Sequence, residues 1–214
     1  MLQHLMLNVR NQSPLVHCIT NYVTVNDCAN VLLACGGSPI MADEWQEVAE
    51  MTSLCQSLVI NIGTLNERTV EAMVMAGKEA NRLGHPVVLD PVGAGATAYR
   101  TAVANRLLTE VKFSVVRGNI SEIKTLYHGT GTTQGVDASE EDRITGDTLD
   151  AAIHLAKALS HRIGSVIAIT GATDIVTDGE KYGSLAMATL VCLKSRVQDA
   201  CLQPSLGRML GLIH

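Results

Sequence analysis

An aspartate and two glycines follow a short apolar segment near the middle of the chain. The stretch HPVVLDPVGAGATAY, residues 85–99, places Asp90 at the end of a run that is typical of a buried strand. Pro91 favours extended backbone at Asp90, while Gly93 and Gly95 allow tight turns and close approach to a ligand. A carboxylate here could hold Mg²⁺, which binds one or two carboxylates together with substrate phosphates. The structural alternative is that Asp90 caps the next helix or accepts hydrogen bonds from turn amides.

A second polar group follows the next predicted strand, in VVRGNISEI, residues 115–123. Arg117 could clamp phosphate oxygens through its planar fork of donors. Glu122 could be a second carboxylate near the metal. The alternative for Glu122 is a capping box at a helix start, with Asn119 or Ser121 as the capping residue.

A third group lies in AITGATDIVTDG, residues 168–179. The hydroxyl of Thr170 and the backbone of Gly171 could cradle phosphate at a strand end. The alternative is a plain β-turn between Ile169 and Asp174. Taken together, three such groups at successive strand ends indicate phosphoryl transfer, where positioning and charge neutralisation supply most of the rate.

A binding site for the second substrate, the acceptor of the phosphoryl group, is indicated by residues 13–43, SPLVHCITNYVTVNDCANVLLACGGSPIMAD. Asn21 could hydrogen-bond a ring nitrogen or a hydroxyl. Val23 and Met41 could offer apolar contact to a small flat molecule. His17 lies inside an apolar run, which favours a hydrogen-bonded core histidine over a general base.

Apolar runs of strand length alternate with longer helical patterns along the chain. Strands are predicted at 14–19, 38–42, 57–63, 86–90, 113–118, 165–171 and 174–179. Helices are predicted at 24–35, 43–55, 66–84, 97–111 and 147–163, and a polar surface segment at 128–146. This alternation predicts an α/β fold with a mostly parallel central sheet flanked by helices. Ligands of such sheets bind beyond the carboxyl ends of the strands, where the three polar groups lie.

The composition fits one large α/β core or at most two small domains, with 214 residues of which 47% are hydrophobic. A net charge of −5 does not indicate a nucleic-acid or membrane-surface partner. No stretch reads as a membrane span or a signal peptide, so we expect a cytoplasmic protein. The six cysteines include no CxxC pair, so we expect mostly buried reduced thiols.

These stretches together resemble the hydroxyethylthiazole kinase family, over about residues 11–181. The resemblance implies a three-layer ribokinase-like fold and Mg²⁺-dependent phosphorylation, by ATP, of the primary alcohol of 4-methyl-5-(2-hydroxyethyl)thiazole in thiamine biosynthesis. It also implies a homotrimer with active sites near the subunit contacts. By motif position, the thiazole would contact Asn21, Val23 and Met41. ATP would contact Arg117, Thr170 and Gly171, and the metal and phosphates would be served by Asp90 and Glu122.

The tail departs from the family after residue 181, which divides a kinase domain (1–181) from an aberrant segment (182–214). The family has MSKVTGTGC there, whose Gly-Thr-Gly amides and helix N-terminus form an anion hole beside a catalytic cysteine. This chain lacks that motif, and neither Cys192 nor Cys201 follows a Gly-x-Gly turn. Back-translation of residues 186–201, shifted by one base, can yield the missing motif. We therefore expect a frameshifted product, from a pseudogene or a sequencing error, that is impaired as a kinase.

Two alternatives to an active thiazole kinase stay open at this point. One is a catalytically inactive remnant that binds the thiazole alcohol or nucleotide, or docks into trimers. The other is an oxidoreductase, but GAGATA imitates the GxGxxG fingerprint only loosely and no acidic ribose partner follows. Hydroxymethylpyrimidine is the nearest alternative substrate.

Overall fold

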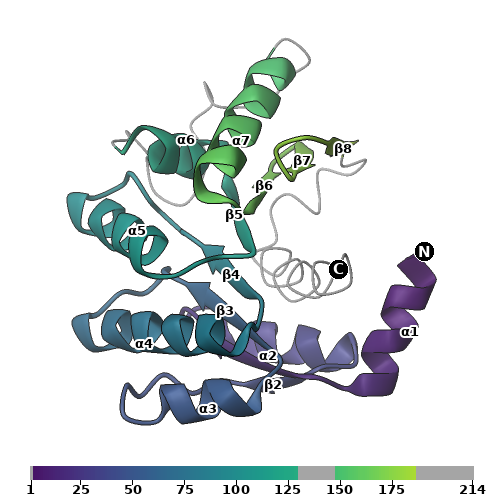
Figure 1. Cartoon of the computed structure of the whole chain (residues 1–214), viewed down its shortest axis with the longest axis vertical. Coiled ribbons are helices and arrows are strands. Elements are labelled where there is room, and N and C mark those ends of the chain that lie inside the picture. The colour runs from purple at the N-terminus through teal and green to yellow at the C-terminus, as the bar shows by residue number, and fades with distance from the viewer. Residues whose placement is uncertain (1, 130–147, 187–214) are drawn as a thin grey trace.

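The computed structural model describes residues 2–129 and 148–186 of the chain, and an eight-stranded sheet lies at its centre (Figure 1). The sheet order is β2-β1-β3-β4-β5-β6-β7-β8. The strands are β1 (Leu15–Ile19), β2 (Ser38–Ile40), β3 (Ser57–Asn61), β4 (Val87–Asp90), β5 (Val115–Asn119), β6 (Val166–Thr170), β7 (Thr173–Thr177) and β8 (Tyr182–Ala186). Strands β1 to β6 pair in parallel, so their carboxyl ends meet at one edge of the sheet.

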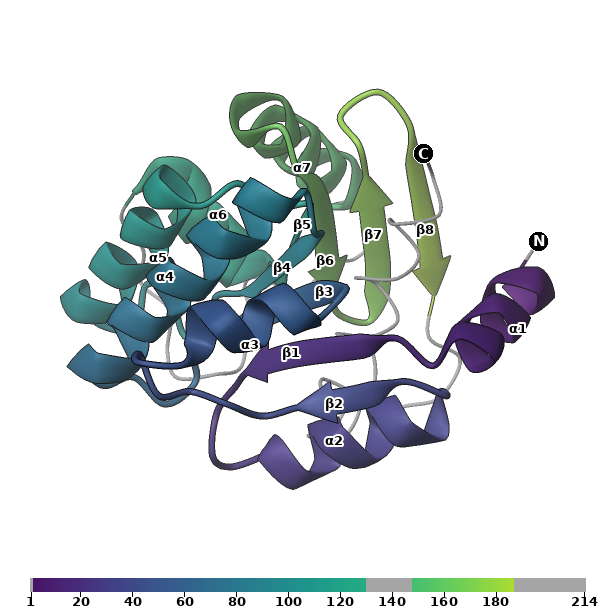
Figure 2. The same cartoon turned by 60° about the horizontal axis from the view of Figure 1, so that its bottom comes forward.

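Helices cover both faces of the sheet and give three layers (Figure 2). They are α1 (Leu2–Gln12), α2 (Val25–Ala34), α3 (Val48–Leu54), α4 (Glu67–Leu83), α5 (Ala98–Glu110), α6 (Ile120–His128) and α7 (Leu149–Ile163). Helices α3 to α7 lie over one face, and α2 packs on the other. The predicted mostly parallel sheet flanked by helices is therefore confirmed.

Side chains alternate between the two faces along each central strand. In β4, Leu89 joins the large core under α4 and α5, whereas Val88 joins the smaller cluster with Leu32 of α2. In β3, Ile60 and Val59 divide in the same way. Because both faces are buried, the strands read as continuous apolar runs instead of alternating patterns. The sequence pattern therefore identified these strands correctly.

The predicted helix at 43–55 is shorter than expected, because residues 45–47 form turns and α3 begins at Val48. The Nε2 of His17 donates to the carbonyl oxygen of Ala42 at 2.7 Å, which fixes this segment before the helix can start. Trp45 thus lies in a turn and not on a helix, with 41% of its surface exposed. The predicted strand at 38–42 likewise ends early, at Ile40.

The last two described strands run antiparallel to their neighbours. The connection between β6 and β7 is too short for a parallel crossover, which needs a dozen or more residues. Strand β8 was not predicted, nor was α1.

Although β8 lies beyond residue 181, the division of the chain at that residue stays a prediction. The predicted surface segment at 128–146 lies almost entirely outside the described residues, as does the tail from residue 187 with its two cysteines.

Two further expectations concern the state of the cysteines and the presence of a membrane-spanning helix. The cysteines in the described residues are free thiols: Cys18, Cys28 and Cys55 are buried and Cys35 is half-buried, as predicted. Within residues 2–129 and 148–186, no helix combines the length and the apolar character needed to cross a membrane.

Candidate active site

Four polar side chains form a continuous hydrogen-bonded row across the carboxyl ends of four neighbouring strands. The Nδ2 of Asn21, which follows β1, donates to Oδ1 of Asn61 in β3 at 3.1 Å. The Nδ2 of Asn61 donates to Oδ2 of Asp90 in β4 at 3.0 Å. The same Oδ2 accepts from Nη1 of Arg117 in β5 at 2.9 Å. We call Asn21, Asn61, Asp90 and Arg117 the polar row.

The parallel register explains why these residues meet. Asn61 is the Cα partner of Asp90, and one strand further on Asn119 is the Cα partner of Thr170. The residues that the sequence assigned to separate strand ends are therefore neighbours in space. This placement agrees with the rule that ligands of parallel sheets bind at the carboxyl edge.

Asp90 and Arg117 form a buried ion pair in which each side chain is 3% exposed. Helix α5 is capped by Thr97, so the alternative that Asp90 caps the next helix is wrong. The Arg117 guanidinium is held against a carboxylate at the base of the site. Its predicted role as a clamp for ATP phosphates stays a prediction.

Glu122 links the loop after β4 to the start of α6. Its Oε1 accepts from the amide of Gly93 and its Oε2 from the amide of Asn119, each at 2.8 Å. Asn119 in turn accepts from the Glu122 amide, so the capping-box alternative is confirmed. Gly93 has a φ of 73°, which favours glycine and aims its amide at Glu122. Burial, and then the nearby Asp90, raise the pKa of Glu122 to about 8.

Thr170 and Gly171 lie at the end of β6, where the chain turns into β7. The Oγ1 of Thr170 is 3.5 Å from the carbonyl oxygen of Gly118. The amide of Gly171 donates to Oδ1 of Asp174 at 3.0 Å, a side-chain contact that holds the connection between the antiparallel strands β6 and β7. The predicted contacts of both residues with ATP stay predictions.

The three residues expected to contact the thiazole lie in two segments: Asn21 and Val23 in the turn after β1, and Met41 directly after β2. The Oδ1 of Asn21 accepts from the amides of Val23 at 3.1 Å and Thr24 at 3.0 Å, and so fixes the turn that leads into α2. Val23 is 64% exposed, whereas Met41 is half-buried beside the cluster under α2. Asn21 therefore belongs both to this turn and to the polar row.

His17 is a buried core residue whose two ring nitrogens are both hydrogen-bonded. Its Nδ1 lies 2.8 Å from Oγ1 of Thr52, and its Nε2 donates to Ala42. Burial lowers the pKa of His17 and keeps the ring neutral. The prediction of a satisfied core histidine is confirmed.

Two residues that organise the site received no role from the sequence. One is Asn61, at the centre of the polar row. The other is Arg100, whose guanidinium donates to the carbonyl oxygens of Ile62, Gly63 and Val92 at 2.7, 2.8 and 2.9 Å. An arginine in the first turn of a helix opposes the helix dipole, which was the available signal that Arg100 has another function.

The donor set suits Mg²⁺ better than a transition metal. In the described part of the chain no group of three or more His, Cys, Asp or Glu side chains could hold a metal ion. Asp90 offers a carboxylate at the strand ends, whereas both carboxyl oxygens of Glu122 accept from backbone amides. A single carboxylate fits Mg²⁺, which binds one or two carboxylates when substrate phosphates complete its shell. A structural zinc site would need four protein ligands.

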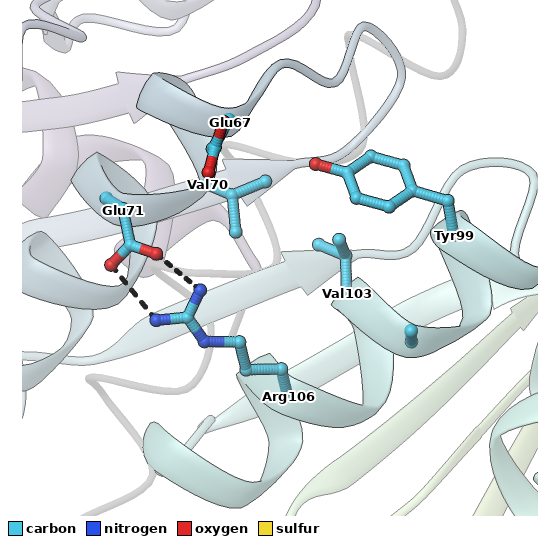
Figure 3. Close-up of a pocket in the computed structure, with 7 residues that line it drawn as sticks. Glu67, Val70, Glu71, Tyr99, Val103 and Arg106 are labelled. Carbon is cyan, nitrogen blue, oxygen red and sulfur yellow. Dashed lines mark hydrogen bonds and ion pairs between the residues drawn. The ribbon is translucent and has the colours of Figure 1, made fainter.

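A pocket of about 340 Å³ lies elsewhere, between α4 and α5 (Figure 3). In Figure 3, Tyr99 extends from α5 toward Val70 of α4. Arg106 donates to both carboxylate oxygens of Glu71, at 2.6 and 3.0 Å, and also to Glu110. The pocket contains none of the residues singled out for chemistry, so we assign the candidate site to the strand ends.

The mostly parallel sheet with helices on both faces is a ribokinase-like α/β fold. The structure is similar to that of a ribokinase-like superfamily protein from Enterococcus faecalis, with a TM-score of 0.54 and 11% identity. That alignment covers 91% of this chain and 71% of the other, and at this identity the likeness concerns the fold alone.

The chain belongs to the hydroxyethylthiazole kinase family, whose model matches residues 6–201. It is 61% identical over 181 residues to a hydroxyethylthiazole kinase from Clostridium acetobutylicum, an alignment that covers 85% of this chain. The chain spans 66% of that relative's length. The structure of a hydroxyethylthiazole kinase protein from Pyrococcus horikoshii superposes with a TM-score of 0.84 at 35% identity, covering 98% of this chain and 76% of the other.

Proposed function

We propose that this chain derives from an enzyme that transfers phosphate from ATP to the primary alcohol of 4-methyl-5-(2-hydroxyethyl)thiazole, in thiamine salvage. The observation that carries the proposal is the polar row, which joins the turn at Asn21 to the Asp90–Arg117 pair by hydrogen bonds of 2.9 to 3.1 Å. This arrangement suits a kinase, because acceptor alcohol and phosphates must be fixed relative to each other before transfer.

The proposed roles follow the position of each residue along the sheet edge. Asn21, Val23 and Met41 would line the thiazole side, and Arg117, Thr170 and Gly171 would serve ATP. Mg²⁺ would be held by Asp90, with Glu122 behind it, and would neutralise charge on the phosphates. Asp90 suits this role because Arg117 favours its ionised form.

Activity of this chain is a separate matter, because residues 182–214 do not contain the sequence GTGC. Removing one oxyanion-type donor costs about 10²–10³ in rate, and the proposed anion hole has several. We therefore propose an impaired kinase, with a catalytically inactive binding or trimer-docking remnant as the second candidate. Sequencing the encoding DNA through its last third tests the frameshift, which requires the motif in the neighbouring frame.

Ligand binding combined with turnover separates the two candidates. We expect the thiazole alcohol and Mg-ATP each to raise the melting temperature of the purified chain, and phosphate transfer to be slow. Binding without any turnover would favour the inactive remnant, whereas binding of neither ligand would refute the proposal. Turnover comparable to that of the Clostridium acetobutylicum relative would refute the impairment.

Assembly and location complete the proposal. We propose a cytoplasmic homotrimer, as expected from the family. Light scattering on the purified chain would give its mass, and a monomer at all concentrations would contradict the trimer.

A further inference from the structure

Asn61 occupies the centre of the polar row and contacts both predicted halves of the site. It is the last residue of β3 and is 3% exposed. Its Oδ1 accepts from Nδ2 of Asn21 at 3.1 Å and from the amide of Gly63 at 2.8 Å. Its Nδ2 donates to Asp90 at 3.0 Å. One amide group therefore bridges the alcohol side and the metal side.

The neighbours of Asn61 require an amide at this position. The Gly63 amide can only donate, and an ionised Asp90 can only accept. The bridge thus needs an acceptor on one side and a donor on the other. An aspartate would supply only acceptors, and a leucine would supply neither. The same requirement fixes which way the Asn61 amide faces.

Burial makes this bridge stiff. An unmet hydrogen bond inside the protein is costly, so Asn61 and its partners must move together or lose contacts. Asn21 also holds the amides of Val23 and Thr24, so a displacement of Asn61 reaches the turn that presents the exposed Val23. A ligand that fixes Asp90 should therefore also fix this turn.

We propose that Asn61 is a positioning residue that couples the acceptor-alcohol half of the site to the metal-phosphate half. This inference rests on the proposed function. The Mg-nucleotide bound at Asp90 preorganises Asn21 through Asn61, and the thiazole alcohol then binds more tightly. Such coupling is reciprocal, and we expect an affinity factor of at least about 5-fold.

Calorimetry on the full chain measures this factor directly. The thiazole alcohol is titrated with and without saturating Mg-ADP, which binds without phosphate transfer. We expect tighter binding with Mg-ADP in the parent chain and a ratio near unity in Asn61→Leu. Asn61→Asp keeps the acceptor for Asn21 and Gly63, so it should still bind the thiazole alcohol in the absence of nucleotide. It loses the donor to Asp90, so the coupling should be lost as well.

Asn81→Leu is the control, because the side chain of Asn81 makes two hydrogen bonds to the backbone of Lys112 and lies outside the site. It should lower stability and leave the coupling unchanged. An undiminished ratio in either folded Asn61 variant would overturn the inference, as would a parent chain that binds both ligands without coupling. Binding of neither ligand by the parent would refute the proposed function, and this inference with it.

Discussion

The Arg117 guanidinium lies against the Asp90 carboxylate, Nη1 to Oδ2 at 2.9 Å, with only 3% of either side chain exposed. Such a pair stabilises little relative to an apolar pair of the same shape, but removal of one partner leaves a buried charge. The pair therefore ties stability to the geometry of the candidate site.

Arg117→Met should lower the free energy of unfolding by about 3–5 kcal/mol, measured by urea denaturation. Adding Asp90→Leu should recover part of the loss, because the uncompensated carboxylate is then gone. Arg68→Met is the control: its pair with Glu44 has exposed side chains, 74% and 44%, so it should change stability by less than about 1 kcal/mol. A similar small change in Arg117→Met would contradict the buried-pair interpretation.

Gly63→Ala should disturb the polar row by crowding. A Cβ at this position would lie 2.8 Å from Cβ of Asn21 and 2.9 Å from Oδ1 of Asn61. Overpacking of this kind costs about 1–3 kcal/mol, and calorimetry should also show weaker binding of the thiazole alcohol. Gly183→Ala meets no atom within 4 Å and serves as the control. Equal effects of the two substitutions would argue against crowding.

Glu122 should make a contribution to the stability of the metal-free chain that is lost as the pH rises from about 5 to 8. Unfolded Glu122 ionises near 4.3, whereas burial and Asp90 raise the pKa of the folded residue to about 8. Between these values the folded state retains a proton that the unfolded state has released, so unfolding is favoured by increasing pH. Urea denaturation over this range should show a flatter pH profile in Glu122→Gln. An unchanged slope in that variant would refute the prediction.

His17 should make the chain less stable in acid. The unfolded residue has a pKa near 6.5, and burial lowers the pKa of the folded residue. Below about pH 6.5 the unfolded state binds a proton that the folded state excludes, so stability falls as the pH is lowered. Thermal denaturation at successive pH values should show a smaller loss in His17→Gln, which can keep a donor toward Ala42. The same loss in both proteins would assign the effect to other groups.

The sequence alone located most of the strands and the residues at their ends. Continuous apolar runs signalled strands buried on both faces, and the parallel topology then placed Asp90, Arg117 and Thr170 at one edge. The helix at 43–55 was predicted too long, because periodicity does not reveal that His17 holds Ala42. Strand β8 was missed for a similar reason: a strand at the edge of a sheet depends on its neighbour more than on its own composition.

Tertiary structure decided how the polar residues are joined. The position of Glu122 after a predicted strand allowed two roles, a capping residue or a carboxylate near the metal. The fold shows the capping contacts together with its proximity to Asp90. Asn61 and Arg100 gained their roles only from contacts with residues distant in the chain. Residue types and spacing can thus determine which groups reach the sheet edge. Which of them share hydrogen bonds depends on strand register and burial, which one sequence does not specify.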